Sequence, residues 1–130
     1  LNGVIFTPKT ADPYQGKAVR ASMGGIFHQK IFRDIEPLFL FNQAEKAGVQ
    51  IVAGDPEARV NIFDHNFIKP TLLLVGNEAN GISQAWKKIS LKKLKIPQPG
   101  GAESLNAAVA AGILIYESIR QRLIMDTCKN

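Results

Sequence analysis

The sequence contains a single cysteine, Cys128. One thiol cannot form an internal disulfide, and it excludes a cysteine-rich zinc site. No apolar run approaches the roughly 18 to 20 residues of a membrane-spanning helix. We therefore expect a protein without a membrane segment or a bound metal, located in the reducing environment of the cytoplasm.

Several motifs of well-known chemistries are also missing. Neither the G-x-G-x-x-G dinucleotide pattern nor the G-x-x-x-x-G-K-[ST] phosphate loop occurs, and there is no G-x-S-x-G turn. The two histidines, His28 and His65, stand apart and show no metal-ligand spacing, so we expect structural or surface roles for both. These absences disfavour nucleotide hydrolysis, esterase chemistry and zinc chemistry.

The 130 residues carry a net charge of +5 and are enough for one domain with its own core. A basic balance favours a polyanionic partner. Five lysines crowd into one stretch, at Lys87, Lys88, Lys92, Lys93 and Lys95. Nucleic-acid contact and a solvated helix face with a strand edge explain this cluster equally well.

Apolar spacing and breaker residues predict strands that alternate with helices. Strands are expected at residues 4–6, 49–53, 61–64, 71–75 and 94–96, and helices at 17–27, 35–47, 84–89 and 104–125. Asp34 is expected to cap the second helix and Gly48 to end it. Phe39 and Trp86 are expected in the core. The strand at 71–75 reads as buried on both faces. This pattern indicates an α/β fold with a mostly parallel sheet flanked by helices.

Two polar, glycine-containing loops follow predicted strands, at residues 76–83 and 98–103, and the second leads into the helix expected at 104–125. Parallel α/β sheets bind ligands beyond the carboxyl ends of their strands. Gly76 lacks a Cβ, which would let a ligand reach the backbone. Ser104 suits a helix N-cap, and Asn106 would lie in the first helical turn, beside backbone N–H groups that lack helical partners. The two loops together predict a pocket for a small ligand with polar edges, although a turn and a helix cap would explain each loop alone.

Lys17 and Arg20 lie three residues apart on the predicted helix at 17–27. This spacing places both side chains on one face. Phosphate binding and a solvated surface are equally good explanations.

The motifs G-N-E-A-N-G-I-S (76–83) and I-P-Q-P-G-G-A-E-S-L-N (96–106) resemble the second and third motifs of the SpoU, or TrmH-type, RNA ribose methyltransferases of the SPOUT superfamily. The segment D-P-Y-Q-G-K-A-V-R-A-S-M-G (12–24) is similar to a stretch that many bacterial members carry between the first and second motifs. The resemblance covers nearly the whole chain. The two motifs are specific for the family when they occur in this order, separated by a short helix and a strand.

The resemblance implies that the C-terminal part of the sheet threads through a loop as a deep trefoil knot. It implies a homodimer that transfers a methyl group from S-adenosylmethionine to a ribose 2′-hydroxyl of RNA, with ribosomal RNA favoured over transfer RNA. The cofactor residues would be Gly76, Ile96 and Leu105, the catalytic residues Glu78, Ser104 and Asn106, and the RNA contacts Lys17 and Arg20.

The sequence departs from the family pattern at its N-terminal end. The first motif, N-x-G-x-x-x-R, would supply a catalytic arginine that Glu78 helps to hold, and no such pattern occurs before Asp12. We therefore expect residues 1–130 to be a SpoU-type catalytic domain that lacks its N-terminal strand and helix with the first motif. The alternative is a non-catalytic RNA-binding or assembly module that retains the fold.

Overall fold

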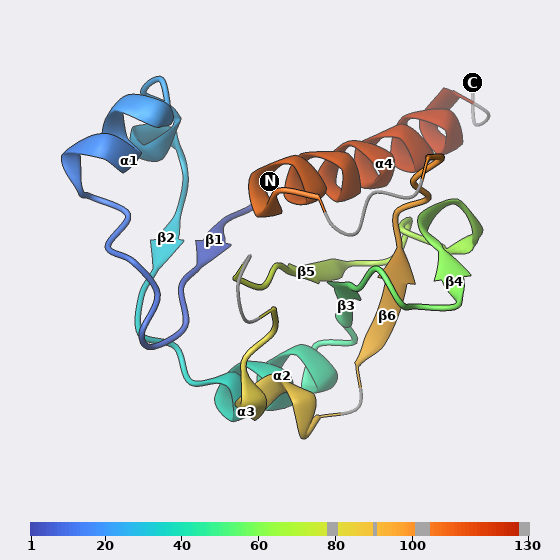
Figure 1. The fold of residues 1–130 in the computed structure, drawn as a ribbon, viewed down its shortest axis with the longest axis horizontal. Helices are drawn as coiled ribbons and strands as arrows, with labels where there is room; N and C mark the ends of the chain where they lie inside the picture. Colours follow the sequence, from blue (N-terminus) through green and yellow to red (C-terminus); the bar gives the residue numbers. More distant parts are fainter. Residues whose placement is uncertain (78–80, 90, 101–104, 128–130) are drawn as a thin grey trace. The chain divides into compact units, whose positions relative to one another are not determined.

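The computed structural model describes residues 1–77, 81–89, 91–100 and 105–127 (Figure 1). The chain divides into two compact units, Leu1–Leu40 and Phe41–Asn130. Within the described ranges, no helix is long and apolar enough to cross a membrane.

The first unit contains a pair of short parallel strands. β1 (Val4–Ile5) pairs with β2 (Ile31–Phe32), and the segment between them forms α1 (Gly16–Ala21) and the 3₁₀ helix η1 (Gly25–His28). The apolar pattern predicted the first strand but not the second. A strand of two residues is too short to show a period in the sequence.

The helix predicted at 17–27 is wrong in its second half. Met23 and Gly24 adopt left-handed backbone, with φ of 48° and 82°, which ends α1. The hydroxyl of Ser22 also donates to the carbonyl of Val19 at 2.7 Å, so this carbonyl of the last turn has a side-chain partner. Met23 and Phe27, which were expected to share a helix face with Val19, are 92% and 71% exposed.

α2 (Pro37–Lys46) begins in the first unit and continues into the second. It starts two residues later than predicted, because Asp34 lies in left-handed backbone with φ of 55°. The fixed φ of Pro37 suits the first position of a helix. The predicted end is confirmed, since Gly48 follows α2 with φ of 65°. Phe39, which was expected in the core, is exposed.

The second unit is built on a parallel sheet of four strands. β3 (Gln50–Gly54), β4 (Val60–Asn61), β5 (Thr71–Leu74) and β6 (Lys92–Lys95) lie in the order β4-β6-β3-β5. Every pairing in this sheet is parallel. α4 (Ala107–Thr127) lies on one side of the sheet, whereas α2 and α3 (Gln84–Lys87) lie on the other (Figure 1). The predicted α/β class with a mostly parallel sheet is confirmed.

Three strands differ from their predictions. β4 ends at Asn61 and continues as the 3₁₀ helix η2 (Ile62–Asp64), and β6 begins two residues before the predicted 94–96. β5 was expected to be buried on both faces, but its residues are only half-buried. The reason is its position, since β5 is the last strand in the sheet order and, among the described residues, pairs with β3 alone.

The core of the second unit lies between the sheet and α4. Its fully buried side chains are Val52, Ile62, Phe67, Leu94 and Leu114. α4 approaches β3 closely at Gly54, where an added Cβ would lie 3.3 Å from Leu114 Cδ1. Trp86 of α3 is 2% exposed, as predicted.

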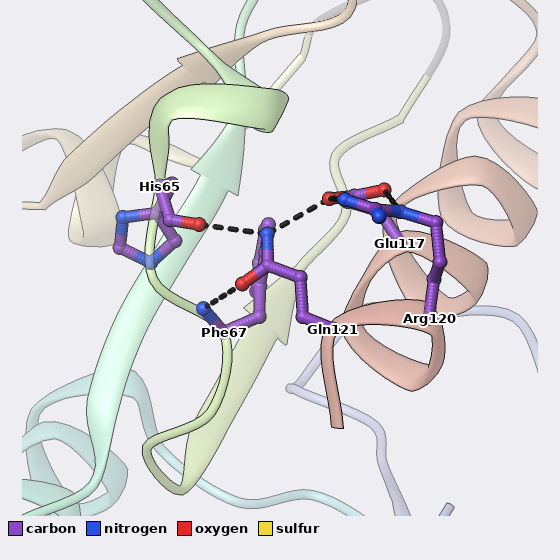
Figure 2. A network of polar contacts seen from close by, with 5 residues as sticks. All are labelled: His65, Phe67, Glu117, Arg120 and Gln121. Atoms are coloured by element: carbon purple, nitrogen blue, oxygen red, sulfur yellow. Dashed lines mark hydrogen bonds and ion pairs between the residues drawn. The ribbon is translucent and has the colours of Figure 1, made fainter. Parts of the chain in front are cut away.

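A polar network joins α4 to the segment between η2 and β5 (Figure 2). The Gln121 side chain accepts from the backbone N–H of Phe67 and donates to the backbone carbonyl of His65, both at 2.9 Å. It also donates to Glu117 at 2.8 Å, and Glu117 binds Arg120 through both carboxylate oxygens. The hydrogen bond from Arg120 holds the pKa of the Glu117 carboxyl below its ordinary value. A nearly buried carboxylate is thereby fully partnered.

His65 is buried beside this network, with its ring edge-on to Phe67 at a centroid distance of 4.6 Å. Burial lowers the pKa of the imidazole, and the charge of Lys92 lowers it further. This location fits the structural role expected for His65.

We predict that Gln121→Met lowers the free energy of unfolding by about 1 to 3 kcal/mol, because it leaves the buried N–H of Phe67 without an acceptor. Urea denaturation measures the change. The matched control is Gln43→Met on the exposed side of α2, which should shift stability by less than about 0.5 kcal/mol. Equal effects of the two substitutions would show that the Gln121 contacts contribute nothing.

Candidate functional site

A cavity of about 520 Å³ lies at the carboxyl ends of three neighbouring strands, β5, β3 and β6. Because the strands are parallel, the segments that leave them meet at one edge of the sheet. Asp55, Val75 and Ile96 come from these three segments, and Trp86 of α3 and Leu114 of α4 add further walls. The volume is in the range of small-ligand sites, about 300 to 1,000 Å³.

Gly76, Ile96 and Leu105, the three predicted cofactor residues, all line this cavity. They follow β5, follow β6 and precede α4, respectively. The fold therefore brings three separate segments of the chain to one place. Their contact with a cofactor stays a prediction.

The space beside Gly76 is filled by the chain itself. A Cβ on Gly76 would lie 2.4 Å from the carbonyl carbon of Gly81 and 2.7 Å from the backbone nitrogen of Ile82. Two backbone hydrogen bonds of 2.9 and 2.7 Å join Asn77 and Gly81. Glycine at 76 thus permits the close approach of Gly81 and Ile82 at the border of the cavity, in addition to any approach by a ligand.

Asn106 caps α4. Its Oδ1 accepts from the backbone N–H groups of Ala108 at 2.9 Å and Val109 at 3.3 Å. The helix predicted to begin at residue 104 begins at Ala107, so Asn106 precedes the first turn and does not lie within it. Asn106 follows Leu105 and precedes Ala107, and both of these neighbours line the cavity.

Four predicted site residues remain: Glu78, Ser104, Lys17 and Arg20. Glu78 and Ser104 lie outside the described residues. Lys17 and Arg20 are exposed on α1 in the first unit. Among the residues that the structure describes, no group of three or more His, Cys, Asp or Glu side chains could hold a metal ion.

An ion pair that sequence reasoning missed also lines the cavity. Asp55 follows β3, and its Oδ2 lies 2.9 Å from Nζ of Lys93 on β6. The hydrogen bond from Lys93 holds the pKa of the Asp55 carboxyl below its ordinary value. The signal was present in the sequence, because Asp55 stands just beyond a strand end, as Gly76 does. Lys93 is therefore partnered, although it was considered only as part of a basic cluster.

Trp86 and Gln98 also line the cavity. Among the described residues, Nε1 of Trp86 and Oε1 of Gln98 are buried without a hydrogen bond, as is Nε2 of His65 outside the cavity. The rest of the wall contains many apolar side chains, including Ile82, Ile89 and Leu91. An apolar cavity with a few convergent polar groups is the usual form of a small-molecule site.

The family model of the SpoU rRNA methylases, described as "SpoU rRNA Methylase family", matches residues 1–116. The chain belongs to the SpoU rRNA methylase family. The resemblance seen in the two motifs is thereby confirmed.

Named relatives support the same family. The chain is 39% identical over 127 residues to the 23S rRNA (uridine(2479)-2′-O)-methyltransferase of Streptomyces viridochromogenes, covering 94% of this chain and 44% of that protein. It is 41% identical over 98 residues to the tRNA (guanosine(18)-2′-O)-methyltransferase of Aquifex aeolicus, covering 75% and 45%. The chain spans about half the length of the curated relatives it matches.

The crystal structure of the SpoU methyltransferase AviRb from Streptomyces viridochromogenes, in complex with the cofactor AdoMet, has a similar fold. Its TM-score is 0.83 at 38% identity, with 93% of this chain and 50% of that chain covered. The α/β arrangement of this chain thus matches that of SpoU structures.

We predict that Gly76→Ala destabilises the protein by about 1 to 3 kcal/mol, because the added methyl group overlaps the backbone of Gly81 and Ile82. Gly112→Ala on α4 is the matched control, since nothing lies within 4 Å of its Cβ position. Alanine in a helix interior should stabilise by up to about 1 kcal/mol. Chemical denaturation of both variants tests the contrast, and a neutral Gly76→Ala would contradict the close packing.

Proposed function

We propose that the protein containing this chain transfers a methyl group from S-adenosylmethionine to a ribose 2′-hydroxyl of RNA. The observation that carries the proposal is the cavity at the strand ends, which gathers Gly76, Ile96 and Leu105 in a member of the SpoU family. Ribosomal RNA is the proposed substrate ahead of transfer RNA. We place the activity in the cytoplasm, where both RNAs occur.

The cavity fits S-adenosylmethionine by size and by chemistry. Its volume of about 520 Å³ is that of a small-ligand site, and many apolar side chains line it. The ion pair of Asp55 and Lys93 adds charges of both signs at the wall, which suits a ligand with a charged amino-acid part. Gly76, Ile96 and Leu105 would hold the cofactor, largely through backbone groups.

S-adenosylmethionine would supply a methyl group on a positively charged sulfur, ready for in-line displacement. The protein must then align the ribose hydroxyl and help to remove its proton. We assign the alignment to Ser104 and Asn106. Glu78 would position the arginine of the family's first motif, N-x-G-x-x-x-R.

RNA binding is assigned to Lys17 and Arg20, which are exposed on one short helix. Positive side chains contact phosphates without reading sequence, so they support affinity more than target choice. The net charge of +5 is consistent with this role.

We also propose that the chain forms a deep trefoil knot and that the protein is a homodimer. The knot is supported by the family and by the convergence of Gly76, Ile96 and Leu105, from three separate segments, on one cavity. The dimer is supported by an apolar stripe on α4, where Val109, Tyr116 and Leu123 recur every seven residues and are exposed. A stripe of this kind is expected where a helix packs against a partner.

We predict that the whole protein binds S-adenosylhomocysteine with one site per chain in isothermal titration calorimetry. With tritiated S-adenosylmethionine, label should enter ribosomal RNA in preference to transfer RNA and should resist alkali at the modified ribose. Absence of cofactor binding by the folded protein would overturn the proposal. Binding without any methyl transfer would favour a non-catalytic RNA-binding module.

A pair of substitutions separates capping from catalysis at Asn106. Asn106→Asp keeps an oxygen that accepts from Ala108 and Val109, so its stability should stay close to that of the native protein, whereas Asn106→Ala should lose about 1 kcal/mol. If the side-chain amide aligns the reacting groups, both variants should lose methyl transfer by about a hundredfold. Full turnover of Asn106→Asp would reduce the role of Asn106 to that of a helix cap. Denaturation curves and single-turnover rates give the two readouts.

A further inference from the structure

An ion pair joins Asp55, which follows β3, to Lys93 of β6, with Oδ2 of Asp55 2.9 Å from Nζ of Lys93. Both residues line the cavity. Both side chains also keep contact with solvent, with exposed fractions of 21% for Asp55 and 54% for Lys93. Neither charge is therefore sealed inside the protein, and a molecule in solution can reach both side chains.

The backbone directs both side chains away from α4. Successive side chains of a strand point to opposite faces of the sheet. Leu94 packs in the core against Leu114 of α4, so its neighbour Lys93 points to the other face. At the end of β3, a Cβ on Gly54 would point at Leu114. The N–H of Asp55 continues the ladder by donating to the carbonyl of Leu94 at 2.9 Å, so the Asp55 side chain points away from α4 as well.

The face opposite α4 is the one that α3 covers, and the cavity extends along it (Figure 1). Trp86 of α3 lines the cavity, as do Ile89 and Leu91 in the segment that leads into β6. Among the described residues of β6 itself, Lys93 alone lines it. The ion pair thus lies on the cavity side of the sheet, next to a largely apolar part of the wall.

The pair retains hydrogen-bonding capacity for a ligand. The Lys93 ammonium group has three N–H donors, and its contact with Asp55 uses one of them. The carboxylate accepts from Lys93 through Oδ2 and from the backbone N–H of Glu57 through Oδ1 at 2.9 Å, and each oxygen can accept a second hydrogen bond. The hydrogen bond between the two groups lowers the pKa of the Asp55 carboxyl and raises the pKa of the Lys93 ammonium, so both are charged at neutral pH.

A fixed pair of opposite charges suits one part of the cofactor better than the others. The amino-acid end of S-adenosylmethionine carries an ammonium and a carboxylate group on the same carbon atom, whereas its adenine and ribose are uncharged. Charged groups are bound most strongly by charged partners. Among the described residues that line the cavity, the charged ones are Asp55, Lys87 and Lys93. Asp55 and Lys93 thus present both signs of charge at one point.

We propose that Lys93 binds the carboxylate of the cofactor's amino-acid end, and that Asp55 positions Lys93 and accepts from the cofactor's ammonium group. This inference rests on the proposed function and names two residues that select a cofactor with an intact amino-acid end. A site built with both charges binds an analogue that lacks one of them less tightly, because one of its own charged groups then has no ligand partner.

The test is a cycle of protein and ligand changes measured by calorimetry on the whole protein. The ligands are S-adenosylhomocysteine, its decarboxylated analogue and its deaminated analogue. The native protein should bind S-adenosylhomocysteine about fivefold more tightly than either analogue, because the pair is partly exposed and its contribution is modest. Lys93→Met should bind S-adenosylhomocysteine and the decarboxylated analogue equally. A Lys93→Met variant that keeps the native preference for the carboxylate would overturn the proposal.

Asp55→Asn tests the second half with a side chain of the same size. It should bind S-adenosylhomocysteine and the deaminated analogue equally, because the partner of the ammonium group has lost its charge. It should also lose part of the preference for the carboxylate, since Lys93 is no longer held by an ion pair. An Asp55→Asn variant with both native preferences would refute the role of Asp55.

Two other lysines provide controls. Lys88→Met should keep the native preferences, because Lys88 is exposed and is not among the described residues that line the cavity. Lys87 does line it, so loss of the carboxylate preference in Lys87→Met but not in Lys93→Met would show that the carboxylate is assigned to the wrong residue. Thermal unfolding verifies that each variant is folded.

The native protein separates this inference from the proposed function. If it binds all three ligands with equal affinity, the assignment of Asp55 and Lys93 fails while the proposed function stands. If it binds none of them, the proposed function fails as well.

Discussion

The parallel pairing of β3, β5 and β6 is the constraint on which the rest of the second unit depends. Parallel strands must end at the same edge, so Gly54, Leu74 and Lys95 deliver their following loops to one place. No single loop forms the cavity. The short polar segments after the three strands become a site only because the sheet aligns them.

α4 covers one side of the sheet, and side chains near both of its ends make hydrogen bonds. Near its start, Asn106 caps the helix beside the cavity. Near its end, Gln121 binds the backbone of His65 and Phe67, and Leu114 lies between these points in the core. The far end thus fastens α4 to the segment before β5 by side-chain hydrogen bonds, whereas the near end borders the cavity.

Much of this organisation could be predicted from sequence, and the failures have physical causes. The strand at 71–75 and the loop with Gly76 were visible because apolar runs and strand ends leave a local pattern. The helix at 17–27 was overextended, since its apolar spacing gave no sign that Met23 would adopt left-handed backbone. The hydrogen bonds of Gln121 to His65 and Phe67 could not be predicted, because partners so distant in sequence are a property of tertiary packing and leave no local signal.

The route of the chain around the cavity also limits when the site can exist. Its walls extend from Gly54 to Leu114, and α4, which supplies the last wall, is held by the core packing of Leu114 and by hydrogen bonds from Gln121 and Arg122 to the segment before β5. Contacts so distant in sequence form late in folding, because long loops must close before any of them is made. A chain in which α4 has not docked therefore has no complete cavity. Ligand binding would report that α4 has reached the sheet.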